Sequence, residues 1–246
     1  AGNPTIFGLG EAGPLVKLSI DDRDDFEVLL NQITDGISAF ETPENEGQLF
    51  ALVNKLVPSH LPSIRFGIET ALFDLLNGGE RKIFNNNFSG GTQGIPINGL
   101  VWMGDMEDML LQITDKIDKG YNCIKIKIGS LNFEKECDIL QYVRNKYYRQ
   151  EIILRVDANG AFSPDEAMEK LDELSKFNIH SIEQPIRAGQ FDLMKELCKK
   201  SPVPIALDEE LIGIHGFENK KILPMLLAFA LLAATSPFLD FSRAET

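Results

Sequence analysis

The sequence predicts an α/β fold in which a small α+β domain is followed by a (β/α) barrel. Beyond residue 95, short apolar runs rich in β-branched residues alternate with helix-like stretches. Charged residues end the successive apolar runs at intervals of about 25–30 residues, which is close to the length of one βα unit. Before residue 90, amphipathic helical periodicity dominates instead. These three observations together favour two domains of different architecture.

Composition narrows the classes of function. The chain has 246 residues, of which 43% are hydrophobic and 25% charged, as in ordinary globular proteins. A net charge of −13 argues against nucleic acid or an anionic membrane surface as the main partner. Cys123, Cys137 and Cys198 form no CxxC pair, which favours a reduced, cytoplasmic protein over a disulfide framework or a zinc site. Residues 1–5 carry no signal-peptide pattern, and we expect none.

The first domain should be mostly helical. Residues 5–20 predict two short strands around a turn rich in glycine. A helix is expected from Ile20, because acidic residues in a first turn suit the helix dipole. Further helices are expected over 46–57 and 62–76, the last ending at the C-cap Asn77-Gly78-Gly79. We therefore predict a first domain of α+β type over residues 1–90.

The second domain, residues 91–246, follows a linker at 84–94 that is rich in Asn, Gly and Ser. Its five expected strands cover 95–101, 122–128, 152–157, 180–183 and 204–207. Its helices are expected over 105–119, 132–147, 164–177 and 189–200. Residues 222–238 are apolar but interrupted by proline, so we expect a helix packed against the barrel rather than a membrane span, with a fragmentary or frameshifted end as the alternative. The recognisable strands stop after the fifth, which predicts a barrel that is incomplete at its C-terminal end.

Charged residues at the C-terminal ends of successive parallel strands converge on one face of such a barrel. Asp157, Glu183 and Asp208 end three of the expected strands and offer the oxygen ligands that Mg²⁺ prefers. Lys125 and Lys127 are two residues apart on one strand, so both should face the same side. The pattern indicates a base beside a divalent cation.

Each of these signals has a structural alternative. Lys125-x-Lys127 could be a solvated face, and Asp157 could cap a βα turn. Asp208 and Glu209 could cap the following helix. Glu183 resists such an explanation, because a carboxylate at the end of an apolar strand needs a partner. The four signals in register outweigh the separate alternatives.

The same motifs resemble the enolase superfamily in its muconate-lactonising subgroup, and within it the o-succinylbenzoate synthase family. The resemblance extends over about residues 5–215 of the chain. The motifs that carry it are Lys125-x-Lys127, Asp157-Ala158-Asn159, Glu183-Gln184-Pro185, Asp208-Glu209, Gly99–Gly104, Ile126–Phe133, Pro62–Leu72 and Gly10-Glu11-Ala12.

This resemblance implies that residues 1–90 are a partial capping domain, with its first strand absent, joined to a TIM-like barrel. It also implies the activity of a Mg²⁺-dependent lyase, with Mn²⁺ as an alternative ion. The reaction implied is a syn-dehydration of a cyclohexadiene carboxylate through an enediolate, in menaquinone biosynthesis. Lys127 would remove the α-proton, and Lys125 would be its electrostatic neighbour. By the same resemblance Asp157, Glu183 and Asp208 would bind the metal, with Asn159 and Glu209 supporting them.

The sequence leaves other functions open. A dipeptide epimerase or racemase of the same superfamily would share every matched residue, and a non-catalytic, metal-binding remnant is a further alternative. The family's lysine on the sixth strand is not recognisable, since Lys220 and Lys221 resemble an exposed helix start. The resemblance also suggests a small-molecule carboxylate as partner and self-association into a homo-oligomer. Trp102 is expected in the core or the pocket wall, and the three histidines, His60, His180 and His215, in structural or surface positions.

Overall fold

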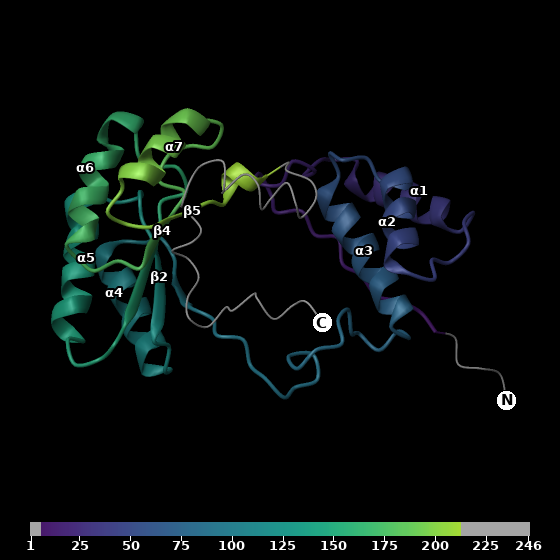
Figure 1. Ribbon diagram of the computed structural model, residues 1–246, viewed down its shortest axis with the longest axis horizontal. Coiled ribbons are helices and arrows are strands. Elements are labelled where there is room, and N and C mark those ends of the chain that lie inside the picture. The colour runs from purple at the N-terminus through teal and green to yellow at the C-terminus, as the bar shows by residue number, and fades with distance from the viewer. Residues whose placement is uncertain (1–5, 213–246) are drawn as a thin grey trace. The chain divides into compact units, whose positions relative to one another are not determined.

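The computed structural model describes residues 6–212 (Figure 1). By internal contacts the chain divides into two compact units, Ala1–Ile95 and Pro96–Thr246. This division lies just after the glycine-rich stretch that we predicted as a linker, while the domain boundary predicted at residue 90 stays a prediction. The apolar stretch 222–238, Lys220, Lys221 and His215 lie outside the described residues.

The described part of the first unit contains three helices, α1 (Phe26–Ile37), α2 (Glu46–Leu56) and α3 (Pro62–Leu76). The last two lie where the sequence predicts them. Asn45 caps α2 by accepting a hydrogen bond from the backbone N–H of Gln48, and Pro62 starts α3 without losing a needed donor. Their inner faces form one buried cluster of Leu49, Val53, Val57, Leu61, Ile64, Ile68 and Leu72.

The two strands predicted within residues 5–20 are wrong over the part that the structure describes, since residues 6–20 form no strand there. Residues near Gly8 and Gly10 instead pass close to the backbone of α3, where an added Cβ would overlap the carbonyls of Ala71 and Gly67. The backbone N–H of Leu9 donates to the buried carboxylate of Asp74, at 2.9 Å, rather than to a neighbouring strand. A side chain of α3 therefore takes the place of a β-ladder partner.

The expected helix start at Ile20 is also wrong, because α1 begins at Phe26. The reason lies in Asp21, whose fully buried carboxylate accepts hydrogen bonds from the N–H (2.7 Å) and hydroxyl (2.9 Å) of Ser63. Asp21 thus accepts hydrogen bonds from the first turn of α3, whose own N-cap residue, Leu61, has no polar side chain. This use of an acidic residue depends on a contact that is distant in the sequence.

Up to residue 212, the second unit is built of alternating strands and helices, and each of these strands lies within its predicted range. The five strands form one parallel sheet in the order β1-β2-β3-β4-β5. They are β1 (Gly99–Val101), β2 (Cys123–Lys127), β3 (Ile153–Asp157), β4 (Ser181–Glu183) and β5 (Ile205–Ala206). The helices are α4 (Met106–Asp118), α5 (Phe133–Lys146), α6 (Pro164–Ser175) and α7 (Phe191–Lys200), followed by the short 3₁₀ helix η1 (Glu209–Leu211). The prediction of an α/β fold is confirmed.

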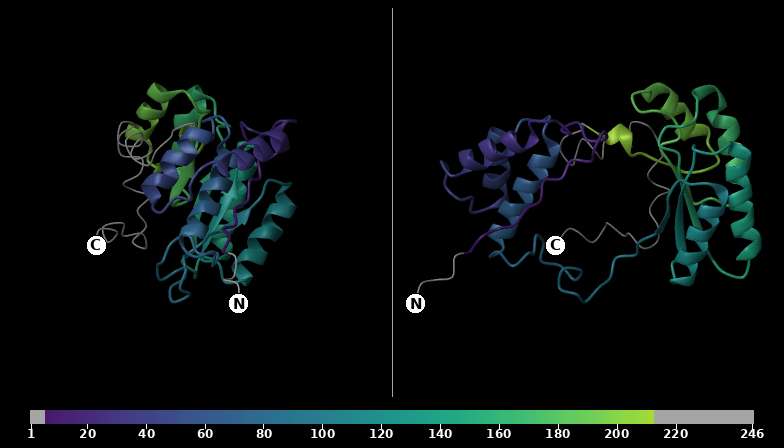
Figure 2. Two further views of the ribbon diagram at one scale, coloured as in Figure 1. Left: turned by 90° about the vertical axis from the view of Figure 1, so that its right-hand side faces the viewer. Right: turned by 180° about the vertical axis from the view of Figure 1, so that it is seen from behind.

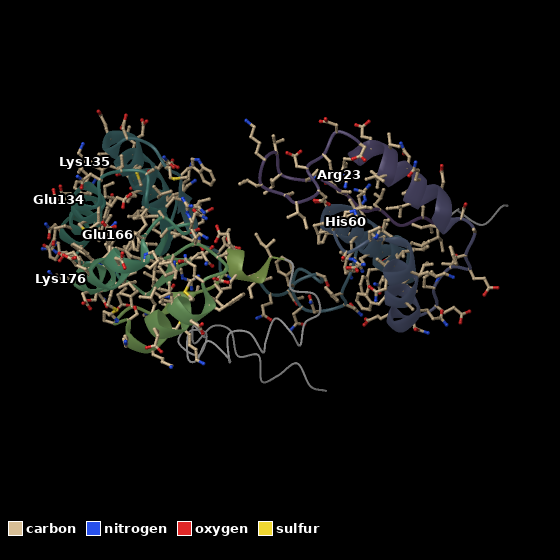
Figure 3. The ribbon with its side chains drawn as sticks, turned by 90° about the horizontal axis from the view of Figure 1, so that it is seen from above. Arg23, His60, Glu134, Lys135, Glu166 and Lys176 are labelled. Atoms are coloured by element: carbon tan, nitrogen blue, oxygen red, sulfur yellow. The ribbon has the colours of Figure 1, made fainter. Side chains whose placement is uncertain are left out.

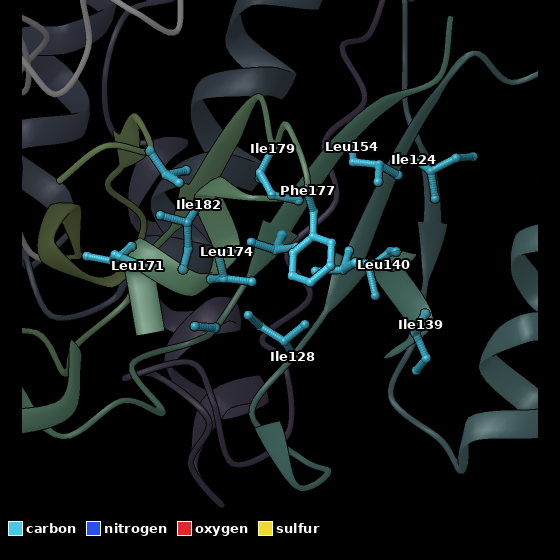
Figure 4. Close-up of a cluster of buried hydrophobic side chains, with 14 of the residues drawn as sticks. Ile124, Ile128, Ile139, Leu140, Leu154, Leu171, Leu174, Phe177, Ile179 and Ile182 are labelled. Atoms are coloured by element: carbon cyan, nitrogen blue, oxygen red, sulfur yellow. The ribbon is translucent and has the colours of Figure 1, made fainter. Parts of the chain in front are cut away.

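The helices of this unit lie along one face of the sheet (Figures 1 and 2). Between them is a large apolar core, in which strand residues such as Ile124 and Leu154 pack with helix residues such as Leu140 and Leu171 (Figure 4). Charged residues of α5 and α6, among them Glu134, Lys135 and Glu166, lie on the outer surface (Figure 3). The opposite face of the sheet is therefore left for residues that the helical layer does not bury.

No helix within residues 6–212 combines the length and the apolar character needed to cross a membrane.

Candidate functional site

Strand alternation places the predicted lysines on the sheet face that is turned away from the helices. In β2, Ile124 and Ile126 are buried in the core, while Lys125 and Lys127 are only partly buried. The prediction that both lysines share one side is confirmed, because both reach the same carboxylate, that of Asp157. The register of the parallel strands then sets Lys127 opposite Asp157, and Asp157 opposite Glu183.

The lysines and carboxylates of this row form an ion-paired cluster. The Nζ of Lys127 donates to Asp157 Oδ2 at 2.6 Å and to Asn159 Oδ1 at 2.8 Å. The Nζ of Lys125 donates to Glu183 Oε2 at 2.9 Å and lies 3.3 Å from Asp157 Oδ2. Asp157 is fully buried, so its charge is balanced by the two ammonium groups rather than by water.

Asn159 connects this cluster to Glu209, which follows strand β5. Its backbone has a φ of 44°, a left-handed conformation that asparagine tolerates, and its N–H donates to Asp157 Oδ1 at 3.1 Å. Its side-chain amide donates to Glu209 Oε1 at 3.0 Å. The other oxygen of Glu209 is buried and has no hydrogen-bond partner within the described residues. Asp157 therefore caps the turn after β3, as the structural alternative predicted, and also forms the ion pair with Lys127.

Gln184 is a positioning residue whose role the sequence did not indicate. Its fully buried amide oxygen accepts from the backbone N–H of Asp208 at 3.1 Å and of Glu210 at 3.4 Å, and its amide nitrogen donates to the carbonyl of Ile186 at 3.0 Å. Glu210 is buried as well, and its carboxylate accepts from the N–H of Gly189. The Gln-Pro pair after Glu183 marked a motif, but nothing local revealed that the amide holds residues 208–210.

The pKa of Glu183 depends on the charges of the other two predicted metal ligands. Burial raises the pKa of Glu183, the carboxylates of Asp157 and Asp208 raise it further, and Lys125 opposes them. Although burial lowers the pKa of Lys125, its hydrogen bond and charge interaction with Glu183 and its pairing with Asp157 outweigh that effect and raise it. Negative charge is thus concentrated at these strand ends.

Asp208 differs from the other two carboxylates, because its side chain is exposed and its carboxylate has no hydrogen-bond partner among the described residues. Over residues 6–212, no group of three or more His, Cys, Asp or Glu side chains is gathered as a metal site. The ammonium groups of Lys125 and Lys127 contact the oxygens of Asp157 and Glu183 that a cation would bind. The metal-binding roles of Asp157, Glu183 and Asp208 stay predictions.

The remaining predicted residues lie around this centre or away from it. Trp102, which we expected in the core or the pocket wall, is 56% exposed, with its ring centroid 5.6 Å from the Nζ of Lys127. Its position excludes the core. His60 is exposed, and burial lowers the pKa of the half-buried His180. All three cysteines are free and half-buried, and burial raises the pKa of Cys198 to about 11, which disfavours a nucleophilic thiolate.

Comparison with known proteins shows which family part of this chain matches. Residues 108–220 match the family described as "Enolase C-terminal domain-like". An o-succinylbenzoate synthase of Desulfotalea psychrophila is 49% identical over 162 residues, which cover 66% of this chain and 44% of that protein. Residues 108–220 therefore form an enolase C-terminal-like domain.

Solved structures of this superfamily share the fold. The structure of MenC from Desulfotalea psychrophila superposes with a TM-score of 0.71 at 38% identity, over 88% of this chain and 65% of MenC. An o-succinylbenzoate synthase of Thermosynechococcus elongatus, described as complexed with Mg in the active site, gives a TM-score of 0.61 at 24% identity, over 82% of this chain and 56% of that one. The chain therefore spans less than two thirds of the length of these relatives.

The residues present at the strand ends fit a hard divalent cation in their donor chemistry. Asp157, Glu183 and Asp208 are carboxylates, the ligand type that Mg²⁺ selects. The charges of Asp157 and Asp208 both raise the pKa of Glu183. The buried oxygen of Glu209 that lacks a partner within the described residues adds an unsatisfied acceptor next to Asn159. In a chain with an enolase C-terminal-like domain, a cation would use this concentration of oxygen donors.

Proposed function

We propose that this chain belongs to a Mg²⁺-dependent lyase of the o-succinylbenzoate synthase type, which dehydrates a cyclohexadiene carboxylate to an aromatic product in menaquinone biosynthesis. The observation that carries the proposal is the row Lys127–Asp157–Glu183, in register on one sheet face with Lys125 beside it. The identity of 49% to an o-succinylbenzoate synthase supports the choice of reaction.

In this proposal Lys127, as a neutral amine, takes the proton from the carbon next to the substrate carboxylate. The hydroxyl group on the neighbouring carbon leaves with its bonding electrons and is protonated by the ammonium of Lys127, so one water is released. Both events use one face of the substrate, which accounts for a syn elimination by a single lysine. Bound Mg²⁺ would supply the positive charge that offsets charge developing on the substrate carboxylate.

The other residues of the cluster would hold this arrangement in place. Asp157, Glu183 and Asp208 would bind Mg²⁺, or Mn²⁺ as the alternative, with Asp157 exchanging its lysine partners for the cation. Asn159 donates to Glu209 and accepts from Lys127, and would therefore keep the base beside the ligands. Lys125 keeps a positive charge near Glu183.

The first test is turnover of the cyclohexadiene carboxylate by the full chain, followed by absorbance of the aromatic product. We expect Lys127→Ala to lower kcat by about 10²–10⁴-fold, the usual contribution of a positioned acid–base group. EDTA should abolish turnover, and added Mg²⁺ should restore it. Lys135→Ala, which changes an exposed lysine of α5, is the matched control and should leave the rate unchanged.

The same assay separates the alternatives. Turnover that survives in Lys127→Ala would disprove the assignment of the base. Racemisation of a dipeptide without dehydration would favour the epimerase, and a Tm raised by Mg²⁺ without any turnover would favour the metal-binding remnant.

A cytoplasmic location and self-association are further proposals, supported by the free cysteines and the likeness to metabolic enzymes.

A further inference from the structure

Trp102 follows directly on strand β1 and lies on the same side of the sheet as the predicted base. Leu100 is in register with Lys125, and Val101 with Ile126, so Trp102 is the next position along, opposite Lys127. Val101 is buried in the core, and alternation therefore turns Trp102 to the lysine face. The 5.6 Å between its ring centroid and the Nζ of Lys127 agrees with this placement.

The backbone of Trp102 is fixed by a side chain of α4. Gln112 accepts a hydrogen bond from the N–H of Trp102 at 2.8 Å and donates to its carbonyl at 3.2 Å. The β1–α4 connection therefore cannot swing freely at this residue, although the indole is 56% exposed. An anchored backbone that carries a large, accessible aromatic ring is a preorganised contact surface.

The indole ring lies next to Lys127, so the contact surface that it forms is beside the predicted base. The ammonium group is held by Asp157 and Asn159 on one side, and lies within cation–π range of the indole on another. A molecule that brings a proton to Lys127 is therefore within reach of the ring of Trp102. A flat ring has the shape to lie against an indole, whereas a flexible dipeptide would offer a smaller and less regular contact.

We infer that Trp102 binds the six-membered ring of the substrate and selects flat, unsaturated ring carboxylates. The inference rests on the proposed function and names the part of the substrate that this residue recognises. Trp102 contacts the ring and takes no proton. It acts by setting the ring against the amine of Lys127.

Trp102 is the only tryptophan of the chain, which allows a direct test. We expect o-succinylbenzoate, added to the full chain with Mg²⁺, to change the tryptophan fluorescence in a saturable way. A ring-saturated analogue of o-succinylbenzoate with the same carboxylates is the ligand control and should bind more weakly.

Titration calorimetry then measures affinity in variants that lack the indole. Trp102→Leu should weaken binding of o-succinylbenzoate by about tenfold, within the range of one aromatic pair, and Trp102→Phe should recover most of it. Phe191→Leu, at an exposed aromatic position on α7, should bind as the wild type does. In turnover, Trp102→Leu should raise KM more than it lowers kcat.

Each failure has a separate meaning. Wild-type affinity and KM in Trp102→Leu would overturn the inference while leaving the proposed function intact. Binding by calorimetry without any change in fluorescence would overturn it as well, and so would the absence of binding to the wild type. If the chain shows no turnover but o-succinylbenzoate still alters the fluorescence and Trp102→Leu still weakens binding, the inference stands and the proposed function fails.

Discussion

At the scale of single residues, the carboxylate of Asp157 is the common partner of the site. It has no exposure to solvent, and it pairs with Lys127 at 2.6 Å and with Lys125 at 3.3 Å. Lys125 has a second acid in Glu183, but among the described residues the only hydrogen-bond partner of Lys127 besides Asp157 is the neutral Asn159. Loss of this one negative charge would leave two nearby positive charges without full compensation.

Asp157→Asn should therefore destabilise the second unit although it preserves the shape of the side chain. Breaking one partner of a buried ion pair commonly costs about 3–5 kcal/mol, and the partial exposure of both lysines argues for the lower end. Urea unfolding at neutral pH measures the effect, with Glu134→Gln on the exposed side of α5 as the control. A loss no larger than that of the control would show that the ion pair contributes nothing to stability.

At the scale of elements, buried acids fix the loops around the sheet. Glu136 lies in α5, is nearly fully buried, and accepts hydrogen bonds from the backbone N–H groups of Gly129 (2.6 Å) and Leu131 (3.1 Å). It therefore ties the β2–α5 connection, which follows Lys127 directly. Burial raises the pKa of Glu136, and the N–H donors oppose that effect without cancelling it.

This raised pKa gives the unit a predictable pH dependence. A carboxyl that binds its proton more tightly in the folded chain stabilises the fold fully below its unfolded pKa and loses that contribution as pH rises through its folded pKa. Glu136→Gln should remove the effect, so the variant should gain stability relative to wild type as pH rises upward from the ordinary value of 4.5. Urea unfolding across that range tests this, and a difference that is the same at every pH would contradict it.

The close approach of the N-terminal segment to α3 makes a second prediction at this scale. A Cβ at Gly10 would overlap the carbonyl of Gly67, whereas a Cβ at Gly13 would meet nothing within 4 Å. Gly10→Ala should destabilise the first unit by about 1–3 kcal/mol, as overpacked substitutions do. Gly13→Ala is the matched control for the change in chain entropy. Equal thermal stability of the two variants would mean that this segment does not pack on α3 in solution.

The success of sequence reasoning differed between elements for a physical reason. The helix over 62–76 and the strands of the sheet follow from local periodicity, a first-turn proline and a glycine stop, all of which the chain carries locally. The same holds for the facing of Lys125 and Lys127. Asp21 and Gln184 were not predictable, because each acts on a backbone that is distant in the sequence and that local pattern does not reveal.

At the scale of the whole molecule, the two units have separate apolar cores. Ile64 is fully buried in the first and Leu154 in the second. Since Trp102 belongs to the second unit, its fluorescence reports the unfolding of that unit, while far-UV circular dichroism follows helices of both. The two signals together can show whether the units unfold independently.

We expect Leu154→Ala to lower the midpoint of the fluorescence transition in urea, with a loss of about 2–5 kcal/mol. Ile64→Ala should cost a similar amount but should move only the part of the circular dichroism transition that fluorescence does not report. If Ile64→Ala shifts the fluorescence midpoint as much as Leu154→Ala does, the two units unfold as one.

The order of the strands has a consequence for biosynthesis. In the sheet β1-β2-β3-β4-β5, each strand pairs with the one made just before it, so a nascent chain can extend the sheet as it leaves the ribosome. Lys127, Asp157 and Glu183 would then come into register before residue 209 leaves the ribosome. Glu209 and Asp208 would join last, once Gln184 has a segment to bind. During synthesis, the growing edge of the sheet is always its newest strand, and this edge is where a chaperone would have most to protect.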